Sequence, residues 1–367
     1  MCIRDSSETL LAQSGQAMVV SHVGARREHP NHDYGEARVS RDVFDVARDP
    51  DVDVLAELIG GTTVARDLIK LAIQQGKHVV TANKALIAEH GNELIAMAEA
   101  AGVQIRYEAA VAGGIPVIKV LRESLAANAV TEVAGIINGT GNFILTEMST
   151  KGRAFDDVLS EAQALGYAEA DPTFDIDGTD AAHKLVILAS LAFGIPLNIE
   201  APMKQGIQEV APEDLECAAS MGYRVKHLGI ARRTKQGIEM RVHPTLIPER
   251  KQIATVDGVL NAVMISGDAV GEVVLVGPGA GGAATASSVC ADLVDVARNA
   301  AGSGPALGIA AVTLQAPNWV PAADIASEWY VRVTTTDQSG VIPDLTQILA
   351  SRDISIESIS EKPPAPK

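Results

Sequence analysis

Short apolar runs alternate with longer helical segments in the first third of the chain, and this rhythm restricts the fold more than any other feature. The runs lie at 52–59, 77–82 and 103–108, and the first of them, VDVLAELI, is almost continuously hydrophobic. Such a run is typical of a strand buried on both faces of a parallel sheet. The segments between the runs, 62–75 and 85–101, have helical spacing and are followed by glycine. Strands that alternate with helices of about 10–15 residues predict a doubly wound parallel sheet with helices on both faces.

The rhythm changes near residue 128, where the pattern becomes that of a mixed α+β domain. Helical segments near 155–165 and 179–193 precede a series of strand-like runs between residues 223 and 276. A stretch rich in glycine and proline follows, and after it a short β-α-β pattern over 328–360 leads into a polar, Pro-rich tail. We therefore predict a parallel-sheet domain at 1–127, a mixed domain at 128–300, a linker at 301–324 and a small C-terminal domain at 325–367.

Composition excludes several classes of function. Acidic residues outnumber basic ones by 46 to 30, a net charge of −16 that argues against nucleic-acid binding, because phosphate recognition needs clustered Lys and Arg. No apolar run approaches the roughly 20 residues needed to cross a membrane, and the first ten residues lack the apolar core of a secretory signal. Cys2, Cys217 and Cys290 are too far apart in the sequence for a CxxC pair. We therefore expect a cytoplasmic protein without a nucleic-acid or membrane partner.

The stretch GYAEADPTFDIDGTDAAHK, from 166 to 184, is the richest in acidic side chains. Asp180 and Lys184 lie four residues apart at the start of a predicted helix, so they share one of its faces. On spacing alone, a solvated ion pair on the helix surface is the more common arrangement. The helix continues, however, with the apolar residues LVILASLAF, which places the lysine beside a buried surface and an acidic loop. A lysine in that setting can exchange protons as an acid or a base.

Three further segments have both a structural and a functional interpretation. Lys84 follows the run 77–82, and ligands bind at the carboxyl ends of strands in doubly wound sheets, although the same residues can be a helix cap beside a surface lysine. The turn 108–116, EAAVAGGIP, can offer backbone carbonyls to a hard cation or can simply connect a strand to a helix. The glycines of 277–282, GPGAGG, can bring backbone amides to an anion at a helix N-terminus or form an ordinary loop.

Taken together, these segments resemble homoserine dehydrogenase, in the bacterial form that carries a C-terminal ACT domain. Matching stretches occur in the order of the family between about residues 50 and 300: ELIGG (57–61), GKHVVTANKALIA (76–88), YEAAVAGGIPVIK (107–119), GIINGTGNFILTEM (135–148), AQALGYAEADPTFDIDGTDAAHK (162–184) and GPGAGGAATASSV (277–289). The later segment YVRVTTTDQSGVIPDLTQILASRDISIESIS is similar to the first half of an ACT domain. The resemblance implies a Rossmann-like doubly wound parallel sheet, a mixed α+β domain for substrate binding and dimerisation, and a partial ferredoxin-like ACT segment.

The reaction that the resemblance implies is a reversible hydride transfer between L-homoserine and L-aspartate 4-semialdehyde with NAD(P), on the branch toward threonine and methionine. Lys184 is then the acid/base that exchanges the proton of the substrate hydroxyl, and Asp180 helps to position the substrate. Lys84 is expected beside the reacting carbonyl and the nicotinamide, and Glu169 beside the substrate ammonium. The residues expected close to the cofactor are Gly166, Gly281 and either Thr62 or Thr63.

The resemblance also implies a monovalent cation and an oligomer. A sodium-like ion is expected to bind mostly through main-chain carbonyls in the set Glu108, Val111, Gly113 and Ile115. Arg26 follows the apolar run MVVSHVGA, at a position where an acidic residue binds the ribose hydroxyls of NAD and an arginine accommodates the 2′-phosphate of NADP. We therefore expect NADP, with NAD as the alternative cofactor, and a homo-oligomer.

The sequence departs from the family pattern at both ends. The first strand and its GxGxxG turn, which binds the pyrophosphate, are not found, and the ACT-like segment is half of the expected β-α-β-β-α-β unit. We therefore expect an open reading frame truncated at both ends, which binds the cofactor poorly or not at all and gives no basis for inferring regulation by threonine. Three alternatives stay open: another amino-acid dehydrogenase, a binding module whose ACT-like tail senses an amino acid, and a protein fused upstream to an aspartate kinase.

Overall fold

The computed structural model describes residues 7–27, 32–299, 304–335 and 340–359. The chain divides into two compact units, residues 1–326 and 327–367, which we call unit 1 and unit 2. Residues 1–6, the first part of the predicted linker and the Pro-rich tail lie outside the described residues. The bounds of the four predicted segments stay predictions.

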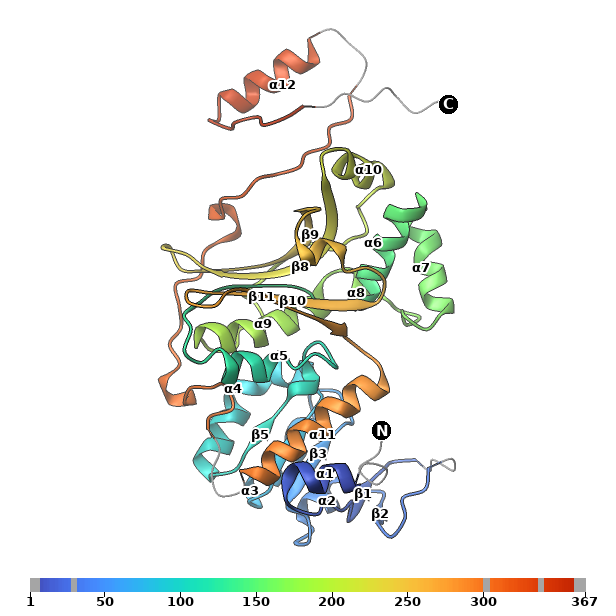
Figure 1. The fold of residues 1–367 in the computed structure, drawn as a ribbon, viewed down its shortest axis with the longest axis vertical. Coiled ribbons are helices and arrows are strands. Elements are labelled where there is room, and N and C mark those ends of the chain that lie inside the picture. Colours follow the sequence, from blue (N-terminus) through green and yellow to red (C-terminus); the bar gives the residue numbers. More distant parts are fainter. Residues whose placement is uncertain (1–6, 28–31, 300–303, 336–339, 360–367) are drawn as a thin grey trace. The chain divides into compact units, whose positions relative to one another are not determined.

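Short parallel strands form the first part of unit 1, and they occur in two separate pieces (Figure 1). One piece pairs β1 (His22–Gly24) with β2 (Arg38–Ser40). The other has the order β3 (Val54–Glu57), β4 (His78–Thr81) and β5 (Ile105–Arg106). The parallel pairing confirms the predicted class of sheet, but no described strand joins β1 to β3.

Three helices follow these strands: α2 (Val43–Arg48), α3 (Val64–Gln74) and α4 (Lys84–Ala101). α4 begins after Asn83, whose Oδ1 accepts the N–H of Leu86, and it ends at Gly102 in the left-handed region at φ 69°. Leu86, Leu94 and other apolar side chains of α4 are buried. The cap at Asn83 makes Lys84 the first residue of α4, close to the carboxyl end of β4.

Two helices from opposite ends of unit 1 pack together beside the parallel strands. α11 (Gly282–Arg298) contacts β4 and the 3₁₀ turn η1 (Glu108–Ala110), while α1 (Ser7–Ser14) contacts α11. Leu10 of α1 meets Cys290 of α11 in a small apolar cluster. Residues far apart in the sequence therefore complete this part of the fold.

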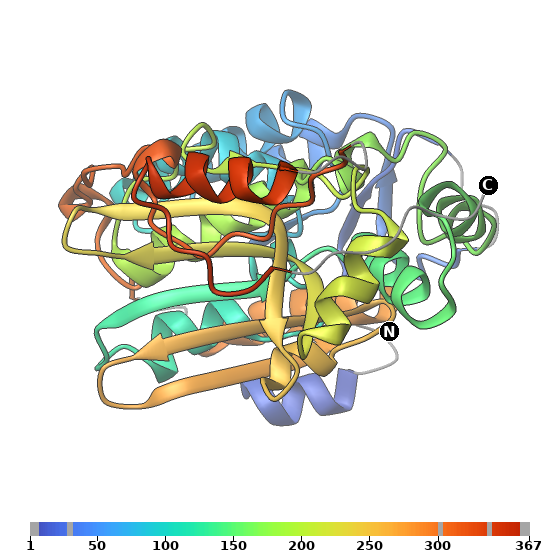
Figure 2. The ribbon, with the colours of Figure 1, turned by 90° about the horizontal axis from the view of Figure 1, so that it is seen from above.

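A six-stranded mixed sheet forms the second part of unit 1 (Figure 2). The strand order is β11-β10-β6-β8-β9-β7, and among the described pairs only β7 with β9 is parallel. The strands are β6 (Val130–Ile136), β7 (Met203–Lys204), β8 (Tyr223–Arg233), β9 (Ile238–Pro248), β10 (Leu260–Gly267) and β11 (Gly271–Pro278). This sheet confirms the mixed α+β character predicted for the second part of the chain.

Shorter helices lie between and around these strands. They are α5 (Val117–Lys119), α6 (Gly139–Lys151), α7 (Phe155–Ala164), α8 (Thr173–Ile176), α10 (Pro212–Ser220), and the 3₁₀ turns η3 (Gln252–Thr255), η4 (Ala311–Thr313) and η5 (Ala322–Asp324). α5 passes into a π-helical turn, η2 (Val120–Ser124), which closes with the N–H of Leu125 donating to the carbonyl of Val120.

The apolar helix α9 (Thr179–Phe193) lies between the two parts of unit 1. It packs on β6, β8 and β9 of the mixed sheet and also contacts α4 beside the parallel strands. Its residues are mostly buried, which agrees with its nearly continuous apolar sequence. None of the described helices combines the length and hydrophobicity that a bilayer-spanning segment requires.

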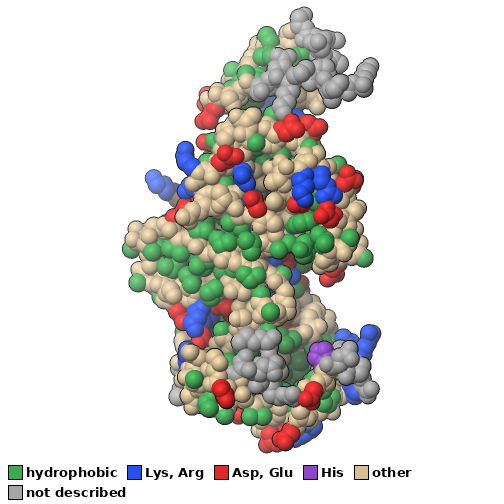
Figure 3. All heavy atoms as spheres, turned by 45° about the vertical axis from the view of Figure 1, so that its right-hand side comes forward, with side chains coloured by type: hydrophobic (Ala, Val, Ile, Leu, Met, Phe, Trp, Pro, Cys, Tyr) green, Lys and Arg blue, Asp and Glu red, His purple; other side chains and the backbone are tan. Residues whose placement is uncertain are grey.

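The mixed sheet ends at β11, whose outer edge pairs with no described strand. Val276 in β11 is 52% exposed, and Val270 in the preceding turn is 45% exposed. Figure 3 shows hydrophobic side chains gathered in a band on one face. An exposed apolar strand edge is a surface on which another chain can pair.

Unit 2 contains one of the three elements predicted for it. The helix α12 (Val341–Ala350) is present, but the described residues form neither of the strands expected at 328–335 and 354–360. Trp329 and Val331 are more than 70% exposed. The β-α-β prediction is therefore wrong for the strands, because the apolar packing that holds an isolated pair of strands together is not formed.

Gly178, which precedes α9, provides a test of this packing. It has φ +89°, and a Cβ atom there would lie 3.1 Å from Cγ1 of Val242 and 3.3 Å from Cε1 of His227. Gly102 has φ +69° with no neighbour near its Cβ position, so it serves as the control for backbone strain alone. We expect Gly178→Ala to lower the free energy of unfolding by about 2–3 kcal/mol and Gly102→Ala by about 1 kcal/mol, measured by urea denaturation. Equal losses in the two variants would contradict the tight packing behind α9.

Candidate active site

The carboxyl ends of β3 and β4 are tied together by a buried carboxylate. Oγ1 of Thr81 donates to Oε2 of Glu57 at 2.6 Å, and Oε1 of Glu57 accepts the N–H groups of Ile59 and Gly60. Nδ2 of Asn83 donates to the carbonyl of Gly61 at 2.7 Å. The two loops that leave the parallel strands are therefore held in place immediately before Lys84.

Asp180 lies between two lysines that come from different parts of unit 1. Its Oδ1 is 2.8 Å from Nζ of Lys84 at the start of α4. Its Oδ2 is 2.7 Å from Nζ of Lys184, one turn later on α9. Nζ of Lys184 also donates to the carbonyl of Ile137 at 2.7 Å, just after β6. One carboxylate thus brings together the helix starts of α4 and α9.

The burial of Asp180 makes its charge dependent on these partners. Its side chain is 3% exposed, whereas those of Lys84 and Lys184 are 33% and 11% exposed. Burial opposes ionisation of Asp180, but the positive charges of Lys184 and Lys84 outweigh it and hold the pKa of Asp180 well below its ordinary value. Asp180 is therefore an anion at neutral pH, and both lysines can donate to it while keeping further N–H bonds for a ligand.

Asn138 and Asp175 belong to this cluster, although neither was among the predicted site residues. Nδ2 of Asn138 donates to Oδ1 of Asp175 at 2.8 Å and to Oδ2 of Asp180 at 2.9 Å. Burial raises the pKa of Asp175; the hydrogen bond from Asn138 opposes this rise and the charge of Asp180 adds to it. The sequence contains a signal for both residues, because each lies in a stretch that matches the family, but spacing along the chain does not reveal that they meet.

An aromatic side chain borders the cluster. Nζ of Lys84 lies 5.6 Å from the ring centroid of Phe174, and that ring meets His183 edge to face at 5.5 Å. Burial lowers the pKa of His183, which favours its neutral form. The cluster therefore combines two amines, two carboxylates and one aromatic face at the meeting point of the two parts of unit 1.

The predicted substrate ligand Glu169 lies outside this hydrogen-bonded cluster. It is exposed on the loop after α7, where its main-chain carbonyl accepts the side chain of Gln163. Gly166 is on the same exposed loop, at φ +75° with open space around its Cβ position. The roles assigned to these two residues stay predictions.

The other predicted cofactor residues lie on separate loops of unit 1. Thr62 is half-buried in the loop between β3 and α3, and Arg26 is exposed after β1. Gly281 precedes α11 at φ +111°. It has no neighbour within 4 Å of its Cβ position, and the same is true of Gly60 and Gly61 after β3. Gly60 and Gly61 therefore leave room for a ligand beside the carboxyl end of β3.

The predicted cation turn is buried and irregular. The carboxylate of Glu108 accepts the N–H groups of Ile118 and Lys119, and the N–H of Glu108 donates to Asp292. Burial raises the pKa of Glu108 to about 7, and the nearby Asp292 adds to the rise. Ser288 of α11 donates to the carbonyl of Gly113 at 2.6 Å. The main-chain carbonyl of Glu108 accepts the N–H of Val111 at 3.4 Å and keeps a second lone pair that it can offer to a cation.

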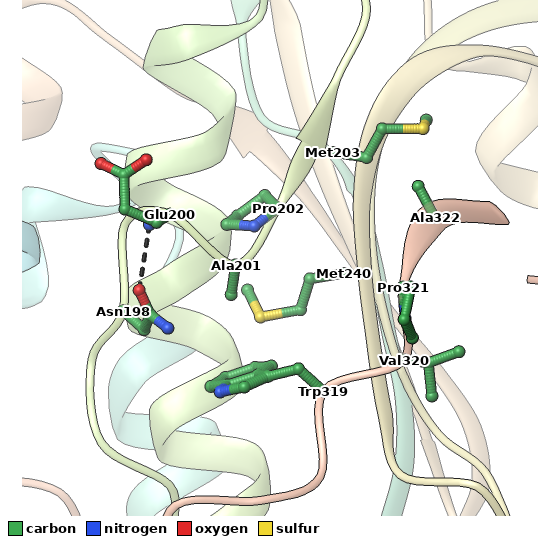
Figure 4. Close-up of a pocket in the computed structure, with 10 residues that line it drawn as sticks. All are labelled: Asn198, Glu200, Ala201, Pro202, Met203, Met240, Trp319, Val320, Pro321 and Ala322. Carbon is green, nitrogen blue, oxygen red and sulfur yellow. Dashed lines mark hydrogen bonds between the residues drawn. The ribbon is translucent and has the colours of Figure 1, made fainter. Parts of the chain in front are cut away.

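No group of three or more His, Cys, Asp or Glu side chains is arranged to hold a metal in the part of the chain that the structure describes. A cavity of about 430 Å³ lies elsewhere in unit 1, and none of the predicted site residues lines it (Figure 4). Its walls include Trp319, Met240 and Pro202, and Figure 4 shows the Trp319 ring and the Met240 sulfur beside Ala201.

Comparison with known proteins gives a consistent family. The sequence model described as homoserine dehydrogenase matches residues 116–294, and the one described as its NAD-binding domain matches residues 5–108. The homoserine dehydrogenase of Pseudomonas aeruginosa is 53% identical over 97% of this chain and 83% of the relative. The chain belongs to the homoserine dehydrogenase family. This membership confirms the predicted Rossmann-like fold class and the prediction of an NAD(P)-dependent oxidoreductase.

Solved structures of the family agree with the fold. A homoserine dehydrogenase from Thiobacillus denitrificans has 48% sequence identity and a TM-score of 0.91, covering 98% of this chain and 84% of that one. A hyperthermophilic archaeal homoserine dehydrogenase in complex with NADPH has 32% identity and a TM-score of 0.60, covering 69% and 74%.

Proposed function

We propose that the chain interconverts L-homoserine and L-aspartate 4-semialdehyde, with Lys184 as the acid/base. The observation that carries this proposal is the Asp180 carboxylate with one lysine on each oxygen, at the carboxyl edge of the parallel strands. An alcohol that loses a hydride must also lose its hydroxyl proton, and a positioned amine can accept that proton and return it in the reverse direction. A bound nicotinamide supplies the hydride acceptor and donor.

Lys184 is the better candidate for proton exchange because its Nζ is fixed from two sides. Ile137 and Asp180 each accept one hydrogen bond from it, which leaves its remaining position for the substrate oxygen. Lys84 forms an ion pair with Asp180 and lies over the ring of Phe174, and its side chain is more exposed than that of Lys184. We assign Lys84 to the stabilisation of negative charge that develops on the reacting oxygen, and Asp180 to the orientation of both amines.

We further propose that Glu169 binds the substrate ammonium. Its exposed carboxylate carries no ion pair with a lysine or arginine among the described residues, so it can pair with a cationic ligand. Gly166, on the same loop, lets a ligand approach the backbone closely because its Cβ position is open.

The residues present fit a dinucleotide at the edge of the parallel strands. Gly60, Thr62 and Lys84 border that edge. The helix α11, which contacts β4, begins after the open Gly281, and its N-terminus can face an anionic group. We propose NADP as the preferred form, with Arg26 near the 2′-phosphate, because an exposed arginine follows β1 at the position that selects the ribose substituent.

We also propose that the buried turn 108–115 binds a sodium-like cation. Ala112 and Gly113 are both in the left-handed region, at φ 55° and 46°, so the turn is irregular. The carbonyl of Gly113 accepts a hydrogen bond from Ser288 and keeps a second lone pair for a cation. The ligands proposed are main-chain carbonyls of Glu108, Val111, Gly113 and Ile115.

Four expectations stay predictions: homo-oligomer formation, cytoplasmic location, a place in threonine and methionine synthesis, and the ACT identity of unit 2. The exposed edge of β11 supports the first of them.

Lys184→Met tests the assignment of the acid/base. We expect NADP-linked oxidation of L-homoserine to fall by about 10²- to 10⁴-fold in turnover number, the usual contribution of a positioned proton acceptor, with L-homoserine binding retained in calorimetry. The matched control is Lys151→Met, because Lys151 also pairs with a carboxylate four residues earlier, Glu147, but on α6. Normal turnover in Lys184→Met would exclude Lys184 as the acid/base.

Arg26→Gln tests the cofactor preference. We expect KM for NADP to rise by about tenfold or more while KM for NAD changes little, since only NADP carries the 2′-phosphate. Arg48→Gln is the control. Arg48 is also an exposed arginine, but it already forms ion pairs with Asp42 and Asp45. An equal effect on both cofactors would contradict a contact between Arg26 and the 2′-phosphate.

Replacing sodium chloride with tetramethylammonium chloride at constant ionic strength tests the cation. A cation that binds only the folded chain stabilises it by about 2.7 kcal/mol at 100 times its dissociation constant, so the thermal midpoint should be several degrees higher in sodium. Identical midpoints in the two salts would contradict the proposed site.

A further inference from the structure

The first residues after β6 contact every charged group of the acid/base cluster except Lys84. The carbonyl of Ile137 accepts Lys184, while the side chain of the next residue, Asn138, donates to Asp175 and to Asp180. Lys84 joins the same assembly through the second oxygen of Asp180. Ile137 therefore contacts the cluster through its backbone, and Asn138 contacts it through its side chain.

The orientation of the Asn138 amide is fixed by a third contact. Its Oδ1 accepts the N–H of Gly141 at 2.7 Å, which makes Asn138 the N-cap of α6. An amide with its oxygen on the helix start must point its NH₂ group toward the two carboxylates. Because Asn138 is only 5% exposed, water cannot readily replace these hydrogen bonds.

The two carboxylates need such a donor between them. Asp175 and Asp180 accept from the same nitrogen, and like charges held this close disfavour each other's ionisation. Besides Asp180, the charged groups that act on Asp175 are Lys184 on α9 and Lys84 on α4. His183, also on α9, is acted on by Asp180 and Lys84 and additionally by Glu89 on α4 and Lys204 in β7. The first two turns of α6 contribute no charged side chain.

We propose that Asn138 is a positioning residue for the reaction: its NH₂ group holds Asp175 and Asp180 side by side as carboxylates and thereby sets the places of Lys84 and Lys184. This inference rests on the proposed function. Asn138 itself exchanges no proton; it acts on the substrate only through the groups that it orients.

Asn138→Ser separates this role from helix capping. A serine oxygen can still cap α6, but it cannot donate to both carboxylates. We expect kcat/KM for L-homoserine to fall on the order of 10- to 100-fold, as for a small misplacement of reacting groups. The acidic limb of the kcat/KM profile should move to higher pH, because Asp175 loses the hydrogen bond that favours its charged form.

Two further variants serve as controls. Asn138→Ala removes the cap as well, so it should have a lower thermal midpoint than Asn138→Ser without a further shift of the pH profile. Asn142→Ser alters another buried asparagine on α6, one that donates to the carbonyls of Val256, Gly258 and Leu260 and touches no carboxylate of the cluster. It should lower stability but leave the acidic limb in place.

A second measurement does not depend on turnover. In Asn138→Ser the folded-state pKa of Asp175 should rise further above the unfolded value. A carboxyl group whose pKa is raised in the folded state stabilises the fold only while it is protonated. This contribution is complete at pH values below the pKa of the group in the unfolded chain, and it is lost as the pH rises through its pKa in the folded chain. Relative to the wild type, Asn138→Ser should therefore lower the free energy of unfolding by more at pH 8 than at pH 4. Asn142→Ser should lower it by the same amount at both pH values.

The outcomes distinguish the inference from the function on which it rests. If the wild-type chain does not oxidise L-homoserine, the proposed function fails, and the stability measurement still decides whether Asn138 holds the carboxylates. If the wild type is active and Asn138→Ser has the wild-type pH profile, the inference is overturned. It is also overturned if Asn138→Ser, which keeps the cap that Asn138→Ala lacks, has full activity. In either case Asn138 is only the cap of α6.

Discussion

The site depends on one buried carboxylate that pairs with two amines. The side chain of Asp180 is 3% exposed, so its charge is stable only while Lys84 and Lys184 stay in contact with it. Because one lysine begins α4 and the other lies on α9, the same interaction also joins the parallel-sheet part of unit 1 to the mixed sheet. Loss of either lysine would leave a poorly compensated charge in the interior, which links the geometry of the reaction to the stability of the fold.

Much of this site could be predicted from local patterns. The four-residue spacing of Asp180 and Lys184 before an apolar sequence indicates a lysine at the edge of a buried helix, and α9 has this form. The strand before Lys84 and the asparagine cap at Asn83 place the second lysine at the carboxyl edge of the sheet. Both inferences need only helix periodicity, end signals and the rule for ligands in doubly wound sheets.

Other features could not be predicted because they depend on contacts between distant segments. Asn138 precedes a glycine and reads as a turn former, so its second role, as a donor to two carboxylates about 40 residues away, has no local signal. Glu169 has a carboxylate in the same acidic stretch as Asp175, yet it is Asp175 that joins the cluster. In unit 2 the helix α12 forms from its own periodicity, whereas the neighbouring strands require partners that local pattern cannot supply.

A crystal structure of the chain with L-homoserine bound would test the central claim most directly. The account predicts that the substrate hydroxyl oxygen lies within hydrogen-bonding distance of Nζ of Lys184, about 2.6–3.2 Å, while Asp180 keeps its contacts with both lysines. A hydroxyl bound away from Lys184, with that amine pointing into solvent and Asp180 paired to neither lysine, would contradict it.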